Sequence, residues 1–315
     1  IEVATYAGID IATDLINFVI DESRDLGARR KASYELPSVG QRVSKEQRRR
    51  LRVLLGKNPD SIQEETILGN VLSALWPIDI SPLELVRELR KPIDSHCFSS
   101  YESFCRRALP VSFGKTLTQS SIKVFLQWAA DFVSYDEPFD YLGELAREIF
   151  TCAWRFVKEE GVATLMALCV KSVCAKKHYA ELPFTDKNDS RFSGVPLLDE
   201  KSYAEDFQGR KALLLALIDI SSPDCDLLGH LHVMSHYPLI GGGDFQALVD
   251  HLRHDENHED GLVQCLRNLA WLVDGGLCSN EFEWLTRTYP EINEFSLKYL
   301  AEQRQAYEKK SEGWR

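Results

Sequence analysis

The sequence predicts an all-α fold, a HEAT/armadillo-like α-solenoid built from degenerate helical hairpins. Apolar residues recur at spacings of three and four in one segment after another, and small or helix-breaking residues separate these segments. The β-branched residues lie within the helical stripes and form no alternating run, so we expect no strand. Because no fixed period is visible, any repeats are degenerate.

The stretch from Gln63 to Arg90 gives the clearest structural prediction. A buried helix is expected to end at Trp76, because Pro77 cannot continue it. The next helix begins with Ser81 as N-cap and Glu84 three residues later, which is the pattern of a capping box. These signals predict a rigid unit of helix, tight corner and helix. Its structural anchors are Trp76, Pro77, Ser81 and Pro82.

Three shorter helices are expected before this unit. Gly27 follows a charged turn and is expected to end the first of them. Ser44 and Gln47 form a second capping box, which begins the third helix, and Gly56 is expected to end it. The expected ranges are 4–20, Ala28 to Leu36 and Lys45 to Leu55.

Helical periodicity continues after the unit, with Pro110 expected to end one helix and Gly161 to break another. The segment 162–175 is apolar enough to lie at the middle of the fold. The expected ranges are Tyr101 to Leu109, Gln119 to Val133, 140–157, Val162 to Ala175, Phe207 to Ile220, a capped start at Ser222-Pro223, Phe245 to Arg253, Gly261 to Val273, Asn280 to Thr288 and Asn293 to Lys309.

Turn-forming residues without periodicity fill the region 181–198. We interpret it as a loop or hinge. The chain is therefore expected to divide into an N-terminal helical half, 1–180, and a C-terminal helical half, 199–315.

Charge is unevenly distributed along the 315 residues. The net charge of −11 argues against a general nucleic-acid coat, but residues 24–57 hold eleven Lys or Arg and three acids, a local charge of +8. A solvated ridge is the favoured interpretation, since neighbouring arginines diverge around a helix. Contact with nucleic acid or an acidic partner is the alternative. The candidate contact residues are Arg29, Arg30, Lys31, Arg48, Arg49 and Arg52.

Cysteine usage and hydropathy predict a cytoplasmic protein that does not enter the membrane. The eight cysteines include no C-x-x-C pair and are expected to be buried thiols. No apolar run approaches the 18 residues of a membrane span. The chain begins at Ile1 without an initiator Met, so we expect an internal piece of a longer protein.

Six of the eight histidines fall between 230 and 258, beside several acids. His251, His254 and His258 would share one face of a continuous helix, a spacing that a metal site could use. The zinc-protease pattern H-E-x-x-H is absent, however, and a polar corner between helices is favoured over a metal site.

Two glycine-containing stretches resemble phosphate-binding loops only in part. Gly241 to Asp244 is better explained as a loop followed by an N-cap. Gly114 to Thr116 ends like a Walker A motif, but Leu109 replaces its first glycine and no buried strand precedes it. No NTPase site, catalytic residue or cofactor is therefore expected in this segment.

One stretch of sequence resembles a known family. It consists of Glu64-Glu-Thr-Ile-Leu-Gly-Asn-Val-Leu-Ser-Ala-Leu-Trp-Pro77, Ser81-Pro-Leu-Glu-Leu and Ser99-Ser-Tyr-Glu-Ser-Phe104. It is similar to the helical region that follows the ATPase module in large bacterial NACHT-type, STAND-class predicted NTPases. The specific match covers about residues 50–130, and Ser100 stands where the family pattern has glycine.

The resemblance implies a multidomain ATP-dependent switch in which this region is the sensor or scaffold, in a class often proposed to act in antiviral defence. ATP and Mg²⁺ are expected only if an NTPase module lies upstream. We therefore expect a non-catalytic sensor or scaffold whose partners are proteins or other domains of the same chain. The alternative is a free-standing helical scaffold for protein or nucleic acid. A metal-dependent enzyme centred on the 230–258 histidines is a third hypothesis.

Overall fold

The computed structural model describes residues 11–40, 42–91, 93, 99–132, 141–175, 205–220 and 287. All regular secondary structure in these residues is helical, which confirms the all-α prediction for the described part of the chain. The chain divides into two compact units, with a boundary between Ala153 and Trp154. The solenoid arrangement stays a prediction. The predicted hinge at 181–198 and the helices predicted between 222 and 309 lie outside the described residues, apart from residue 287.

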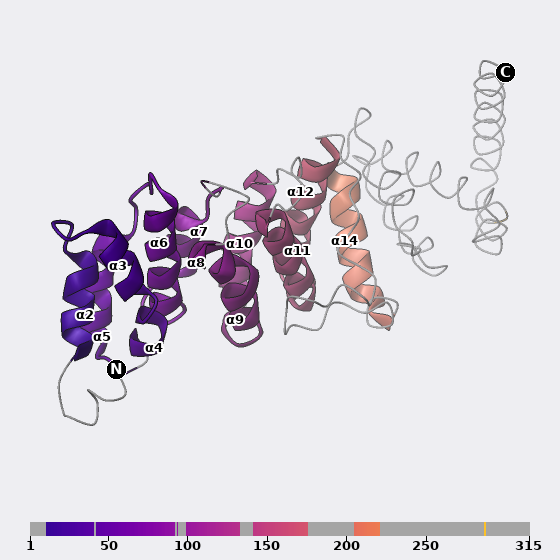
Figure 1. Cartoon of the computed structure of the whole chain (residues 1–315). Coiled ribbons are helices and arrows are strands. Elements are labelled where there is room, and N and C mark those ends of the chain that lie inside the picture. Colours follow the sequence, from indigo (N-terminus) through magenta and orange to yellow (C-terminus); the bar gives the residue numbers. More distant parts are fainter. Residues whose placement is uncertain are drawn as a thin grey trace, which may run out of the picture. The chain divides into compact units, whose positions relative to one another are not determined.

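Unit 1, whose described residues end at Ala153, is a succession of short helices (Figure 1). Their bounds are α2 (Ile11–Ile20), α3 (Leu26–Ser33), α4 (Leu36–Gly40), α5 (Lys45–Arg50), the 3-10 helix η1 (Leu51–Leu54), α6 (Ile62–Leu75), α7 (Pro82–Glu88), α8 (Ser100–Ser103), the π-helix η2 (Phe104–Ala108), α9 (Leu109–Thr116), α10 (Gln119–Phe132) and α11 (Tyr141–Ala153).

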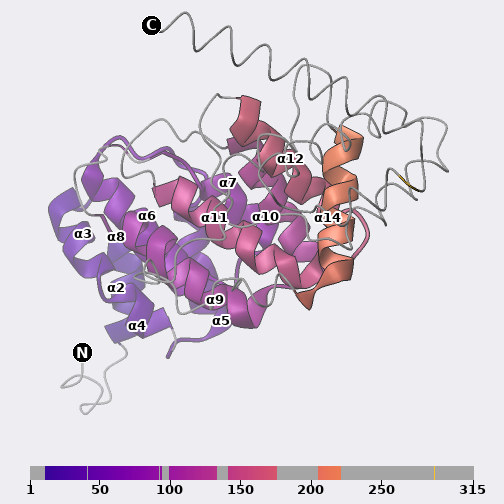
Figure 2. The same ribbon diagram turned by 90° about the vertical axis from the view of Figure 1, so that its right-hand side faces the viewer.

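Helix α6 is the core helix of unit 1. It contacts α3, α4, α5, η1, α8 and η2, and the two views of the ribbon show neighbours around it (Figures 1 and 2). Every residue from Glu65 to Leu72 is buried, so the helix has no solvent face over these two turns. As predicted, it ends at Trp76, and the cis Trp76–Pro77 bond leads into the corner. Helix α6 thus joins the helices from α3 to η1, which precede it, to α8 and η2, which follow it.

Helix α8 meets α6 at a glycine. A Cβ atom on Gly69 would lie 2.1 Å from the backbone nitrogen of Tyr101, so no larger residue fits while the two backbones keep this separation. The Tyr101 ring is completely buried beside this contact. Its hydroxyl donates to the Glu88 carbonyl at 2.8 Å and accepts from the Arg90 N–H at 2.7 Å. Tyr101 thereby joins α8 to the end of α7.

Both predicted capping boxes are present. The Glu84 N–H donates to Ser81 Oγ at 3.3 Å, and the Ser81 N–H donates to Glu84 Oε2 at 2.9 Å. Ser44 and Gln47 make the equivalent pair of bonds at the start of α5. Gly56, with a φ of +75°, follows the 3-10 turn and ends this helical stretch as predicted. These local signals were correctly interpreted from sequence because both partners lie within four residues.

The prediction that Gly27 ends the first helix is wrong. Gly27 lies in the first turn of α3. The helix α2 ends before Asp21, whose carboxylate accepts from the Ser23 N–H at 3.1 Å. Asp25 then caps α3 by accepting from the Ala28 N–H at 2.8 Å. The two aspartates satisfy the backbone donors of the turn, so the glycine is not needed to end a helix.

Pro110 does not end its helix either. The helical path runs from Ser100 to Thr116, and Pro110 lies in the first turn of α9. The preceding turn is a π-helix, in which the Leu109 N–H donates to the Phe104 carbonyl five residues back. Proline breaks a helix because it lacks an N–H and clashes with the carbonyl four residues earlier. The widened π turn accommodates both effects, and burial of Phe113 favours continuation.

Trp76 connects the end of α6 to the next helices of unit 1. Its indole Nε1 donates to Ser112 Oγ at 2.7 Å, and its ring meets Phe125 in a T-shaped contact with centroids 6.0 Å apart. Phe125 also packs against Phe113 at a centroid distance of 5.2 Å. The predicted role of Trp76 as an anchor therefore has a specific set of partners on α9 and α10.

Unit 2 is described by η3 (Trp154–Phe156), α12 (Val162–Ala175) and α14 (Phe207–Ile220). Gly161 has a φ of +74° and separates η3 from α12, as predicted. Helices α12 and α14 pack together. Asp206 caps α14 by accepting from the Gly209 N–H at 3.0 Å and forms an ion pair with Lys158 at 3.1 Å. The Lys171 ammonium donates to the Ile220 carbonyl at the other end of α14.

Two further predictions concern the described residues only in part. Cys105, Cys152 and Cys169 are buried thiols, as expected, and the remaining cysteines lie where no side chain is described. None of the described helices has both the length and the apolar content that crossing a membrane requires.

Candidate functional site

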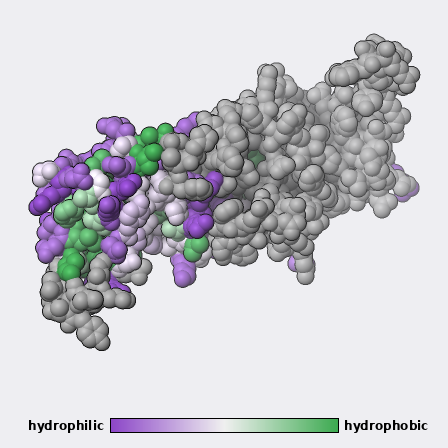
Figure 3. Space-filling view, in the orientation of Figure 1, coloured by the Kyte–Doolittle hydropathy of each residue, from purple (hydrophilic) through white to green (hydrophobic). Residues whose placement is uncertain are grey.

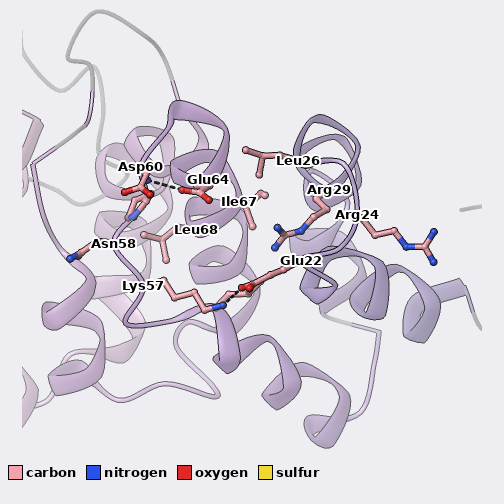
Figure 4. A pocket seen from close by; sticks show the side chains of 12 residues that line it. Glu22, Arg24, Leu26, Arg29, Lys57, Asn58, Asp60, Glu64, Ile67 and Leu68 are labelled. Carbon is pink, nitrogen blue, oxygen red and sulfur yellow. Dashed lines mark hydrogen bonds and ion pairs between the residues drawn. The ribbon is translucent and has the colours of Figure 1, made fainter.

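A pocket of about 370 Å³ opens on unit 1 and is a candidate binding site within the described residues. Three segments form it: the α2–α3 turn with the start of α3, the loop from η1 to α6, and the first turns of α6 (Figure 4). Ligand pockets in proteins are typically about 300–1,000 Å³. The volume therefore suits a small molecule or a single large side chain.

Aliphatic side chains form one wall of the pocket. Leu54, Ile67 and Leu68 are 4–7 % exposed and belong to the core around α6, and Leu26 adds a half-buried side chain. Burial of an apolar ligand group against such a wall is favourable by about 25 cal/mol per Å². The wall gives the pocket affinity for an apolar body and little selectivity.

Arg29 is the buried cation of the pocket. It is 8 % exposed, and its Nε–H donates to the Val19 carbonyl at the end of α2, at 2.9 Å. This hydrogen bond fixes the side chain across the α2–α3 turn. The guanidinium is directed into the pocket (Figure 4).

Arg24, by contrast, is an exposed cation of the pocket edge. Its guanidinium points away from the pocket (Figure 4), pairs with Asp21 at 3.0 Å and lies 5.5 Å from the Phe18 ring centroid.

Glu22 and Lys57 form an ion pair across the pocket mouth. Both are exposed, at 62 % and 48 % of the side chain, so the pair is screened by solvent and adds little stability. The hydrogen bond from the Lys57 ammonium, together with its charge, lowers the pKa of the Glu22 carboxyl, and the charge of Arg29 adds a smaller effect in the same direction. Glu22 therefore stays ionised near neutral pH.

The acidic side of the pocket lies at the start of α6. Glu64 Oε2 accepts from the Asp60 N–H at 2.7 Å, and the Glu64 N–H donates to the N-cap Ser61 Oγ at 3.3 Å. Negative side chains are favourable at a helix N-terminus, where backbone N–H groups are unpaired. Glu64 therefore has a structural role, and the exposed Asp60 carboxylate remains beside the opening.

The basic segment 24–57 has two kinds of cation. Arg48 and Arg52 bind the corner after α6: Arg48 pairs with the buried Asp79 carboxylate, and Arg52 donates to the Asp79 carbonyl at 2.6 Å and pairs with Glu84. Arg49 and Lys31 are exposed, and Arg30 is half-buried. The hypothesis that these six residues, Arg29 included, contact a partner stays a prediction.

The remaining sequence candidates are separate from this site. Gly114 to Thr116 form the last residues of α9, so their backbone has helical geometry and forms no phosphate-binding loop. His251, His254 and His258, and Gly241 to Asp244, lie outside the described residues. Within the described part of the chain, no group of three or more metal-ligating side chains is assembled.

The structure adds residues that sequence reasoning missed. Glu22 and Lys57 were not singled out, because an ion pair between positions 35 residues apart leaves no local signal. The aliphatic wall of Leu54, Ile67 and Leu68 was not predicted as part of a pocket either. Arg29 was included only as one cation of the basic segment. Comparisons with protein-family models, curated proteins and solved structures found no match for this chain.

Proposed function

We propose that this chain is a non-catalytic sensor and scaffold region of a larger NACHT-type, STAND-class NTPase of the kind implicated in antiviral defence. It would respond to a ligand or partner by repacking its helices. One observation supports the proposal. In the stretch that resembles the NACHT-type family, residues 64–104, the small and polar side chains make packing contacts and hydrogen bonds between helices.

Four contacts carry this observation. Gly69 admits α8, and Trp76 donates to Ser112. Glu65, 2 % exposed, accepts from the Ile93 N–H at 2.9 Å. The Asn70 side-chain amide donates to Ser33 Oγ at 2.9 Å, which joins α6 to α3. Close packing and buried hydrogen bonds of this kind favour two discrete arrangements over continuous deformation, which suits a switch.

The first experiment that tests the proposal is to sequence the open reading frame on both sides of the segment. A Walker A lysine and a Walker B acid upstream are expected, and the purified segment should show no ATP hydrolysis above buffer. A reading frame without an NTPase module would remove the switch and leave an autonomous scaffold. ATP hydrolysis above the buffer control by the segment alone would contradict its non-catalytic role.

The nucleic-acid alternative is favoured by one observation, the exposed Arg49 and Arg50 on α5. The test is the replacement of both by Glu, because Arg48 and Arg52 are held in the fold and their replacement would confuse binding with unfolding. If the segment binds nucleic acid here, the variant should lose affinity and its salt dependence should weaken by about two phosphate contacts. Unchanged binding would exclude this face.

The metal-enzyme hypothesis depends on residues outside the described part of the chain. Elemental analysis of the purified protein tests it directly. Metal at one equivalent that disappears when His251 and His254 are replaced by Ala would support a site there. Sub-stoichiometric metal with unchanged folding of the variant would remove it.

A further inference from the structure

The pocket of unit 1 holds a buried cation with an incomplete set of partners. Arg29 is 8 % exposed, and its Nε–H donates to Val19. Its two terminal amino groups make no hydrogen bond, and no carboxylate of the described chain comes within 4.0 Å of them. These nitrogens are not enclosed by the protein, so an incoming group can reach them from the pocket. The side chain is held in place and directed into the pocket (Figure 4).

We propose that this pocket binds a small ligand that carries a carboxylate or phosphate group on a short apolar body. The free end of a guanidinium presents parallel N–H donors that match two oxygens of such a group. Leu54, Ile67 and Leu68 supply the wall for the apolar body. The volume of about 370 Å³ limits that body to roughly one ring or a short chain.

The other charged groups of the pocket do not replace Arg29. Arg24 is bound to Asp21 and points away, and Lys57 is paired with Glu22 (Figure 4). On the acidic side, Glu64 accepts from the Asp60 backbone. Arg29 is therefore the cation whose remaining donors are directed into the pocket, and an anionic ligand group is favoured over a cationic one.

The Glu22 carboxylate at the pocket mouth should lower the affinity of Arg29 for an anion. Glu22 is held by Lys57, yet its charge interacts with that of Arg29. The negative charge of Glu22 lowers the positive potential that an incoming anion meets. Replacing Glu22 by Gln should therefore raise the affinity for an anion. The 62 % exposed Glu22 side chain can be replaced without loss of core packing.

This inference rests on the proposed sensor function, for which it supplies the class of ligand. The two can fail separately, because binding is measured on this segment and the sensor assignment depends on the flanking reading frame. If an NTPase module lies upstream but the pocket binds none of the probes, the sensor assignment stands and the ligand site is rejected. If the pocket binds a probe but no NTPase module lies upstream, the ligand site stands and the sensor assignment is rejected.

The test is a ligand-observed NMR titration of the purified 315-residue chain. Benzoate and phenyl phosphate carry both features, benzamide has the ring without the charge, and acetate and inorganic phosphate have the charge without the ring. The charged aromatic probes should bind at least about tenfold more tightly than benzamide, as expected for one charge-assisted contact. Equal binding of benzoate and benzamide, or none of either, would overturn the proposal.

Three single substitutions locate the site. Arg29→Gln should reduce benzoate affinity about tenfold or more, whereas Arg24→Gln, with the same change of charge at the exposed pocket edge, should leave it unchanged. Equal losses for both would mean attraction to the general surface charge and would refute the proposal. Should Arg29→Gln fail to fold by circular dichroism, Glu22→Gln decides: a higher affinity supports the site, and an unchanged affinity rejects it.

Discussion

Replacement of Arg48 by Ala should destabilise unit 1 severely, although Arg48 lies in a run of arginines that looks solvated in sequence. Its side chain is 12 % exposed and pairs with the Asp79 carboxylate, which is fully buried. Its Nη1 group also donates to the carbonyls of Gly40 and Val43, both at 2.9 Å. One side chain thus joins α4, α5 and the corner after α6.

The magnitude follows from what the substitution leaves behind. Removing one partner of a buried ion pair typically costs about 3–5 kcal/mol, because the remaining charge is uncompensated. Asp79 would keep a buried carboxylate, of which Oδ1 already has no hydrogen bond. The corresponding loss in the melting temperature of unit 1 is on the order of 10 °C.

The assay is urea unfolding of the full chain, followed by far-UV circular dichroism. Arg49→Ala is the matched control, since its exposed side chain lies one residue away and the change of charge is the same. It should change the free energy of unfolding by no more than about 0.5 kcal/mol. An Arg48→Met, Asp79→Leu double variant should recover much of the loss. Equal effects of Arg48→Ala and Arg49→Ala would refute the buried-pair explanation.

Three further predictions test the packing and the titration of unit 1. Gly69→Ala should lower the free energy of unfolding by about 1–3 kcal/mol or more, because its Cβ would overlap the backbone of α8. Gly114→Ala, whose Cβ would meet open space, should be neutral or stabilising, and thermal melting compares the two variants. Hydrogen bonds from the N-cap serine lower the pKa of Glu84 below 4.5, so its charge stabilises the fold above that pH and less so as pH falls through the lowered pKa. In urea titrations, wild type should be more stable than Glu84→Gln by a few tenths of a kcal/mol after screening, and this advantage should shrink below pH 4.5. An advantage that grows in acid would contradict the capping role. Burial raises the pKa of the Cys105 thiol, so iodoacetamide at pH 8 should modify it only after urea unfolding, and rapid labelling of the folded chain, mapped by mass spectrometry, would show that the site is open.

The predictions that succeeded concern partners close together in the chain. The capping boxes at Ser44 and Ser81 depend on hydrogen bonds between residues three apart, so the sequence contains both partners in one window. The periodic segments 162–175 and 207–220 were predicted with the bounds that the structure has, because their apolar spacing is uninterrupted.

The predictions that failed concern residues whose effect depends on their surroundings. Gly27 and Pro110 are helix breakers by propensity, but a propensity of a few kcal/mol is outweighed when neighbouring groups satisfy the backbone. Asp25 does so for Gly27, and the π turn before Leu109 does so for Pro110. Neither compensation can be read from the breaker residue itself.

The sequence by itself determined the helical class, the caps and the corner at Trp76, because periodicity and capping act within a few residues. Only the tertiary structure decided which arginines are structural. Arg48 and Arg49 are adjacent and chemically identical, yet about 100° of helix rotation places one on a buried carboxylate and the other in solvent. Arg29 likewise becomes a pocket cation because α2 supplies a carbonyl to its Nε–H while leaving its remaining donors toward the opening. Such long-range pairing of charge and burial is a property of the packed chain, and no local pattern encodes it.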